Sequence, residues 1–476
     1  MKNKKTVLIT LMVSLVSSLA LPAVAFSSAF LLPSQFDETY LSELPYKIDR
    51  LKENKDEKKI VLIGGSSVPF ALKSKLAEKE LADYRVIDFG LYAALGSKVM
   101  LDLALPYISK DDIVVFSPEL HSQMFSLSFS PKLLWQAFDG QYSRVSLLGW
   151  DDVSEMISSI PEFSKSKFSY LRSGKKPGTD DIYMRSSFDE FGDISSPLNY
   201  ANSMYNLFDS TMPISFSDSL LDEEFLSYVN DFYRKVTSKG AKMYYRFAPM
   251  NARAIVDLRD LDGFYQKLNG KLECPLMGNP HDQVMDPLYF FDTNYHLNSS
   301  GSIVFTRRLV MDLKLELGDD SVTSIQVPAK PLPMEKEFVA QNDEDMECFE
   351  YEENDKIARI VSLKPEFRNR ESLIIPSMYH SKPVISFASL LFEGSQVRRV
   401  TVQDNIRELF DGCLKGVKEV ILTNDRPSSI KVAQDLFLKE EGKIYVPDDV
   451  LYRYKVDYSW SRYSDVIYPY SEIGLK

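Results

Sequence analysis

Short apolar runs, each followed by a stretch with helical spacing, constrain the fold of this chain more than any other feature. The runs lie at 58–65, 84–90, 111–117 and 241–249. The stretches with helical spacing lie at 68–81, 97–108, 222–240 and 303–317. Continuous apolar strands that alternate with helices are typical of a parallel sheet covered on both faces. The sequence therefore predicts an α/β domain over residues 59–320.

The first 36 residues predict export. A basic stretch, MKNKK, precedes a run without any charge up to Asp37. This run exceeds the roughly 20 residues that cross a bilayer as a helix, while the triplet Ala23-Val24-Ala25 suits a signal peptidase. The segment is either an uncleaved membrane anchor or a cleaved signal peptide. In both cases we expect the globular part on the extracellular side of the cytoplasmic membrane or at the cell surface, as in a bacterial surface protein.

The composition excludes several classes of function. With 476 residues, 44% hydrophobic and 26% charged, the chain is long enough for more than one globular domain. A net charge of −12 argues against binding to nucleic acid. The three cysteines and four histidines lie far apart, and they form neither a disulfide framework nor a zinc pattern. We therefore expect no metal and no cofactor.

Two charged stretches divide the chain. Residues 37–58 are charged with some helical spacing and predict a stalk. Residues 321–355 contain prolines and then a strongly acidic run, which predicts a linker. We expect a second domain at 356–476.

A repeat in the second domain supports that division. Val400 and Val402 recur as Val420 and Leu422, an offset of twenty residues. A period of this length is typical of solenoids, in which each turn buries its apolar face on the next. A Tyr/Trp-rich ending at 444–467 suits closure of such a stack. Its Tyr458, Trp460 and Tyr463 are either packed there or exposed as a platform for sugars.

The block GGSS, Gly64 to Ser67, follows the first strand directly. A turn from a strand into a helix offers free backbone N–H groups and the positive end of the helix dipole. A serine at such a turn becomes a nucleophile when a base and a site for the oxyanion are present. It can equally be a simple helix cap. Ser66 is the first candidate, and Ser67 follows if the register shifts by one.

A histidine and a carboxylate precede the last helix. In FFDTNYHLNSSG, Asp292 and His296 are close enough to act as a base and the group that orients it. The alternative is a loop histidine beside an aspartate that closes an Asx-turn.

Together these two blocks resemble those of the SGNH (GDSL-type) hydrolase family, over residues 59–318. KKIVLIGGS matches the first block, except that Gly65 replaces the family's aspartate. His296 matches the histidine of the Asp-x-x-His block, and Asp292 stands one residue too far before it. The resemblance implies a flavodoxin-like parallel sheet, with Ser66 as nucleophile, His296 as base and Asp292 as its orienter.

The family's two other blocks are altered. Ala93 stands where a glycine N–H helps to hold the oxyanion, together with the N–H of Ser66, and Gly90 lies three residues earlier. Glu119 stands where an asparagine donates to the oxyanion. A protonated Glu119 could donate, an ionised one would repel, and it could instead orient His296 or a substrate hydroxyl, or face solvent. Gly65 and Asn294, inside the two matched blocks, are further possible site residues.

The resemblance implies a function at the cell envelope. Surface relatives with this fold remove or transfer acyl groups on cell-envelope polymers, which suggests a serine esterase or O-acyltransferase acting on an exported, acylated glycan. The second domain resembles the BspA-type leucine-rich repeats of bacterial surface proteins, which implies a protein or glycan ligand. The alternative is a catalytically inactive SGNH-like scaffold that carries a repeat module for adhesion or partner binding.

Overall fold

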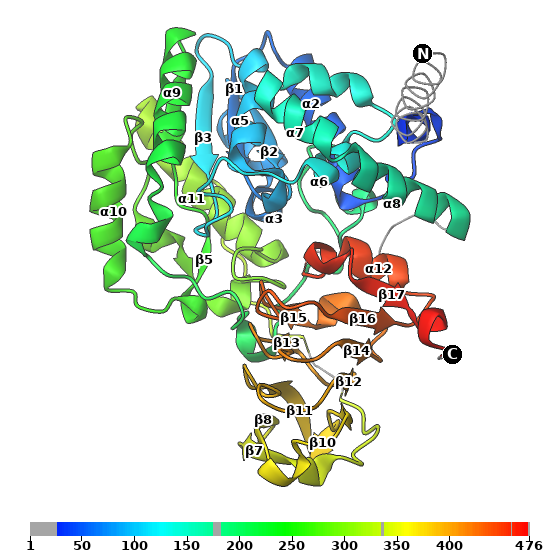
Figure 1. The fold of residues 1–476 in the computed structure, drawn as a ribbon. Helices are drawn as coiled ribbons and strands as arrows, with labels where there is room; N and C mark the ends of the chain where they lie inside the picture. The colour runs from blue at the N-terminus through cyan, green and yellow to red at the C-terminus, as the bar shows by residue number, and fades with distance from the viewer. Residues whose placement is uncertain (1–25, 175–181, 335–337, 458, 475–476) are drawn as a thin grey trace, which may run out of the picture.

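The computed structural model describes residues 26–174, 182–334, 338–457 and 459–474. Figure 1 shows two regions, a first one in blue to green and a second one in yellow to red that lies beneath it. The first region contains a parallel sheet flanked by helices, and the second contains two further sheets. The chain is therefore a mixed α/β protein, as the apolar runs predict.

The sheet of the first region is formed by four predicted strands. They are β1 (Lys59–Gly64), β2 (Arg85–Gly90), β3 (Ile113–Ser117) and β4 (Lys242–Tyr245). The order is β2-β1-β3-β4, and every neighbouring pair is parallel. Gly64 is in register with Gly90 on one side and with Ser117 on the other. The carboxyl ends of three strands therefore meet at one edge of the sheet.

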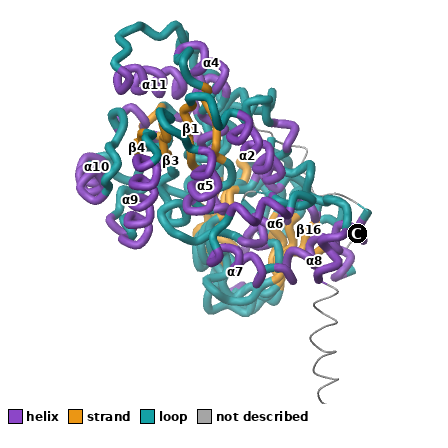
Figure 2. The backbone as a smooth tube through the Cα atoms, turned by 90° about the horizontal axis from the view of Figure 1, so that it is seen from above, coloured by secondary structure: helices purple, strands orange, loops and turns teal. Residues whose placement is uncertain are grey.

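Helices cover both faces of this sheet (Figure 2). One face packs on α2 (Leu44–Glu53), α5 (Ser97–Ala104) and α9 (Glu223–Ser238), and the other packs on α4 (Ser74–Glu80) and α11 (Ser299–Leu317). Successive strand residues point to opposite faces, so the two cores alternate along β1. Val61 and Ile63 belong to the first core, and Ile60 and Leu62 belong to the second. The remaining helices of four or more α-helical residues are α3 (Ser67–Ala71), α6 (Pro131–Ala137), α7 (Trp150–Ser158), α8 (Ile160–Ser173), α10 (Asp260–Lys271) and α12 (Leu451–Val456).

The helix predicted at 68–81 is two helices in the structure. The chain is extended at Leu72, between α3 and α4. The backbone N–H of Lys73 there donates to the hydroxyl of Thr306 on α11, at 2.9 Å. A bond to another helix thus replaces a bond within the helix, and it holds α3 close to α11.

The predicted stalk, residues 37–58, belongs to the first core instead. It contains α2, whose Leu44, Ile48 and Leu51 are fully buried against the sheet. Most charged residues of this stretch are exposed, but Lys47 of α2 is buried and pairs with Asp88 at 2.9 Å. The charges suggested a stalk, but the apolar spacing places the segment in the domain.

The predicted anchor or signal, residues 1–36, lies mostly outside the described residues. Its end is described, and Phe36 is fully buried there. The ring of Phe30 contacts those of Trp135 and Phe163. Among the residues that the structure describes, no helix is long and apolar enough to span a membrane.

The second region consists of two sheets with mostly parallel pairing. One has the order β15-β13-β11-β8-β7, with β10 at the edge of β11, and the other has the order β17-β16-β14-β12-β9. The first sheet comprises β7 (Phe349–Glu353), β8 (Ala358–Leu363), β10 (Met378–Tyr379), β11 (Lys382–Phe387), β13 (Glu408–Leu409) and β15 (Lys431–Val432). The second comprises β9 (Ser372–Ile374), β12 (Arg399–Val402), β14 (Glu419–Leu422), β16 (Lys443–Val446) and β17 (Ile467–Pro469).

The offset of twenty residues is visible in the pairing of these strands. Val400 pairs with Val420 and Val402 pairs with Leu422, in a parallel register. All four side chains are buried in one core with residues of the other sheet.

The structure also bears on the two predictions for the ends of the second region, the linker at 321–355 and the aromatic ending at 444–467. The predicted linker, 321–355, ends in β7, so its last residues belong to the sheet. Trp460 and Tyr463 of the aromatic ending are buried in the same core, which favours packing over an exposed platform for sugars. Tyr458 lies outside the described residues.

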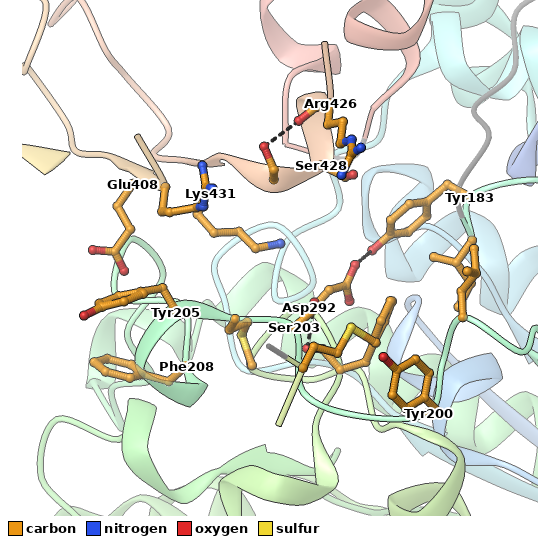
Figure 3. A pocket seen from close by; sticks show the side chains of 17 residues that line it. Tyr183, Tyr200, Ser203, Tyr205, Phe208, Asp292, Glu408, Arg426, Ser428 and Lys431 are labelled. Carbon is orange, nitrogen blue, oxygen red and sulfur yellow. Dashed lines mark hydrogen bonds between the residues drawn. The ribbon is translucent and has the colours of Figure 1, made fainter. Parts of the chain in front are cut away.

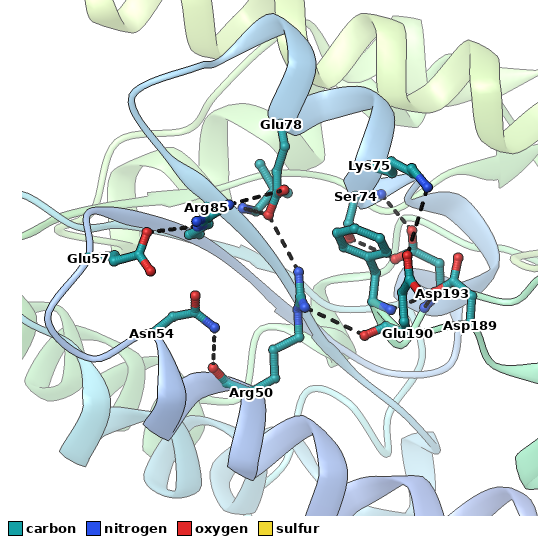
Figure 4. A network of polar contacts seen from close by, with 12 residues as sticks. Arg50, Asn54, Glu57, Ser74, Lys75, Glu78, Arg85, Asp189, Glu190 and Asp193 are labelled. Carbon is teal, nitrogen blue, oxygen red and sulfur yellow. Dashed lines mark hydrogen bonds and ion pairs between the residues drawn. The ribbon is translucent and has the colours of Figure 1, made fainter.

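Hydrogen bonds connect the segment around Asp193 to helices α2 and α4, which cover the sheet (Figure 4). Arg50 of α2 donates to Glu78 of α4 at 3.4 Å. The Asp193 carboxylate accepts from the backbone N–H of Ser74 at 2.5 Å and from its hydroxyl at 2.8 Å. Burial and two neighbouring carboxylates raise the pKa of Asp193 to about 8. The network holds the chain that follows Tyr183, a residue of the candidate site.

Candidate active site

The GGSS turn lies at the carboxyl edge of the sheet, between the ends of β2 and β3. A Cβ at residue 64 would come within 2.4 Å of the Ser117 carbonyl oxygen, and a Cβ at residue 65 would come within 2.8 Å of a Glu119 carboxylate oxygen. Both glycines therefore permit a close approach to the end of β3. Ser66 is the N-cap residue of α3, but its side chain makes no capping hydrogen bond. The hydroxyl is directed to other partners, which removes the simple capping interpretation.

The Ser66 hydroxyl contacts His296. The distance from Ser66 Oγ to His296 Nε2 is 2.8 Å, and His296 Nδ1 lies 2.9 Å from Asp292 Oδ1. The His296 ring also stacks on Phe70 of α3, with the centroids 4.0 Å apart. The structure thus brings together the serine, histidine and aspartate selected from the sequence, in the geometry of a nucleophile, its base and an orienting acid.

The loop before α11 explains the unusual spacing of Asp292 and His296. The Thr293 hydroxyl accepts from the backbone N–H of Tyr295 at 3.2 Å and from that of His296 at 3.0 Å. This turn folds the chain back, so that a carboxylate four residues before the histidine reaches Nδ1. The helix that follows is capped by Asn298, whose side chain accepts from the N–H of Gly301.

Tyr183 is a site residue that the sequence does not single out. Its hydroxyl donates to Asp292 Oδ2 at 2.5 Å and lies 3.2 Å from His296 Nδ1. Burial alone would raise the pKa of the Asp292 carboxyl, but the His296 ring, the charge of Lys431 and the Tyr183 hydroxyl together outweigh it, so this pKa lies below its ordinary value. Asp292 is therefore ionised at neutral pH, as an orienting acid must be.

Glu119 approaches Ser66 from the other side. It is 1% exposed, so the solvent-facing alternative is wrong. Its Oε1 accepts from the backbone N–H of Ser67 at 2.6 Å and lies 3.4 Å from Ser66 Oγ, while Oε2 lies 3.0 Å from His121 Nε2. Burial alone would raise the pKa of Glu119, but His121, His296 and the Ser67 N–H together lower it. The protonated, donating form is therefore disfavoured.

A chain of five side chains results, in which Ser66 lies between two histidine–carboxylate pairs. Asp292 and His296 form one pair, and Glu119 and His121 form the other. The serine has only one proton to donate, and His296 is its nearer partner. His121 stands in no motif, so the sequence alone does not single it out.

The sequence also selects Gly90, Ala93, Asn294 and Ser67 as further site residues. The N–H of Gly90 donates to its neighbour Asp88, which leaves Ala93 as the predicted second oxyanion donor. The Asn294 side chain bonds the backbone of Asp209 and Met212, so it holds a loop and does not contact the serine. The Ser67 hydroxyl is buried and has no hydrogen-bond partner among the described residues.

Two cavities flank the site, and the second region borders both. The first has a volume of about 680 Å³ and reaches Tyr183 and Asp292. Figure 3 shows Tyr200 and Tyr205 along it and Lys431 extending into it. The second has a volume of about 620 Å³ and is lined by Ala93 and His121. Ser66 lines neither cavity and is fully buried.

The described residues contain no cluster of three histidine, cysteine, aspartate or glutamate side chains that could hold a metal ion. The three cysteines are buried and free.

Comparisons with known proteins add little. No protein-family model matches the sequence, and no curated protein matches it. Among solved structures, protein YxiM of Bacillus subtilis is similar with a TM-score of 0.27 and 11% identity, over 55% of this chain and 57% of that one. A likeness this slight carries no weight for fold or function.

Proposed function

We propose that the chain is an SGNH-like serine esterase or O-acyltransferase that acts on acyl groups of an exported polysaccharide. The observation that carries the proposal is the continuous contact from Asp292 through His296 to Ser66, with distances of 2.9 and 2.8 Å. Side chains 230 residues apart converge at the carboxyl edge of a parallel sheet, where such folds place their ligands.

The reaction follows from these contacts. Ser66 Oγ attacks the ester carbonyl carbon while His296 Nε2 takes its proton. The backbone N–H groups of Ser66 and Ala93 are the proposed hydrogen-bond donors to the oxyanion. As the carbonyl re-forms, the alcohol leaves with the proton from His296. Water or a sugar hydroxyl then gives its proton to His296 and attacks the acyl-enzyme. The bond from the acyl carbon to Ser66 Oγ breaks, Oγ takes the proton back from His296, and a carboxylic acid or a new ester is released.

The remaining parts of the proposal concern the setting of this reaction. The first region is a flavodoxin-like, SGNH-like domain at the cell surface, held at the membrane or released according to the fate of residues 1–36. The second region is a short solenoid of BspA-like leucine-rich repeats with a protein or glycan ligand. The parallel pairing at an offset of twenty residues supports the repeat assignment.

Two observations favour a second candidate function. Ser66 is fully buried, and an ionised carboxylate lies 3.4 Å from its hydroxyl. A non-catalytic scaffold that carries a binding module could tolerate both features.

An activity-based probe separates the two functions. A fluorophosphonate should label the full chain, and Ser66→Ala and His296→Ala should each abolish the labelling. Ser67→Ala should leave it in place and serves as the matched control. Absence of labelling in the folded wild-type chain would favour the scaffold.

A further inference from the structure

The cavity that reaches Ala93 and His121 lies between the two regions. Residues of the first region form one wall, and Lys455, Arg462 and their neighbours near the end of the chain form the other. The two walls are joined by a hydrogen bond of 3.1 Å between the hydroxyls of Tyr92 and Ser461. The second region therefore completes this cavity.

The lining of this cavity is rich in neutral polar groups. Besides Tyr92, nine of its residues are serines or glutamines, among them Ser122 and Gln136 on one wall and Gln434 and Ser464 on the other. Hydroxyls and amides both donate and accept hydrogen bonds. A ligand that carries many hydroxyl groups, such as a carbohydrate, matches this lining.

The same cavity carries an excess of positive charge. Lys132, Lys455 and Arg462 line it. Lys132 is paired with Asp465 at 3.2 Å, while Lys455 and Arg462 form no ion pair among the described residues. Burial and the charge of Lys132 lower the pKa of Lys455, so an anion placed here would relieve an existing repulsion. Among the described residues, no aspartate or glutamate lines this cavity, whereas Asp292 and Glu408 line the other one.

We infer that this cavity binds an anionic carbohydrate, as the polyhydroxylated part of the ester or the acceptor that Ser66 serves. The inference deepens the proposed function and rests on it. His121 connects the cavity to the nucleophile, because it contacts Glu119, whose other oxygen lies 3.4 Å from Ser66 Oγ.

The other cavity fits this role less well. It reaches Asp292, which contacts His296 at Nδ1, whereas Ser66 contacts Nε2. These nitrogens lie on opposite edges of the imidazole ring, so this cavity opens on the acid and not on the nucleophile. Its aromatic wall and Lys431 provide a matched control for the test.

The test measures binding without chemistry. Calorimetry on the full-length Ser66→Ala protein in detergent compares tetragalacturonate with its methyl ester, which keeps the hydroxyl groups and lacks the charge. We expect the acid to bind at least tenfold more tightly. Lys455→Gln combined with Arg462→Gln should weaken its binding at least tenfold, Lys455→Arg should retain it, and Lys431→Gln should leave it unchanged. Glycerol 3-phosphate, as a parallel probe, distinguishes a phosphate-bearing from a carboxylate-bearing ligand.

The outcomes separate this inference from the proposed function. Equal binding of the acid and its methyl ester, loss of binding in Lys431→Gln alone, or no binding of tetragalacturonate and glycerol 3-phosphate would overturn the inference. Hydrolysis of a small ester such as p-nitrophenyl acetate tests Ser66 independently. Wild-type protein that binds tetragalacturonate but does not hydrolyse the small ester would count against the proposed function and not against the binding cavity.

Discussion

Replacement of Glu119 by glutamine tests the least expected feature of the site. The carboxylate lies 3.4 Å from Ser66 Oγ, and its lowered pKa keeps it ionised at neutral pH. In Glu119→Gln the side chain keeps its shape and an oxygen for the Ser67 N–H, now 2.6 Å away. The variant loses the negative charge, and its amide nitrogen takes the place of Oε2, which faces His121.

The size of the effect follows from Coulomb's law. The oxyanion is bonded to the same carbon as Ser66 Oγ, so the two negative charges would lie about 5 Å apart, which at an effective dielectric constant of about 20 costs about 3 kcal/mol. Since about 1.4 kcal/mol corresponds to a tenfold change in rate, Glu119→Gln should react about 10- to 100-fold faster. Because charge-assisted hydrogen bonds become neutral ones, the same change should cost about 1–2 kcal/mol of stability.

The assay is the rate of fluorophosphonate labelling near pH 7, with Ser66→Ala as the blank. A thermal melt of each protein shows whether the variant is folded at the temperature of the assay. A folded Glu119→Gln protein that labels at the wild-type rate, or more slowly, would refute the electrostatic reasoning. Glu119 would then support the reaction, most directly through its contact with His121.

Three further substitutions probe the surroundings of the site. Tyr183→Phe removes a hydrogen-bond donor to the ionised Asp292, and such a bond contributes about 1.5–3 kcal/mol. The rate of ester hydrolysis should fall about 10- to 100-fold, and the acid limb of its pH profile should move to higher pH. Unchanged kinetics would exclude a positioning role for Tyr183. Asp193 has a folded pKa of about 8 against an ordinary 3.8, so the free energy of unfolding should fall as pH rises between these values. Asp193→Asn should reduce that fall in denaturant titrations across pH, while Glu43 and Asp88, whose pKa values are raised to about 7 and about 6, sustain the remainder; an unchanged slope would show that Asp193 is not one of its sources. Gly90→Ala places a Cβ 2.3 Å from a valine side chain of α3 and should lower stability by about 1–3 kcal/mol; full stability in urea would contradict this crowding.

The sheet and its last helix are predictable because their signals are local. Each strand is a continuous apolar run, and α11 has Asn298 before its first residue and Gly318 after its last. The N-terminal helix α2 could also have been placed in the core. Leu44, Ile48 and Leu51 follow helical spacing, but the many charges of the segment concealed this signal.

The candidate site is predictable only in part. Ser66, Asp292 and His296 stand in motifs, and a motif fixes the chemistry that its residues can perform. Tyr183 contacts Asp292 across 109 residues of sequence, from a stretch without periodicity. The contact of His121 with Glu119 depends on the path of the chain after β3, and the pattern of apolar residues does not predict that path.

The complete burial of Ser66 bears on the fate of an acyl group held there. Bulk water, at high concentration, competes with any sugar for an acyl-enzyme that it can reach. A serine that the surrounding protein closes off loses that competitor. If the acyl-enzyme keeps this closed arrangement, it should persist until an acceptor occupies the adjoining polar cavity. Such kinetic partitioning would favour transfer over hydrolysis.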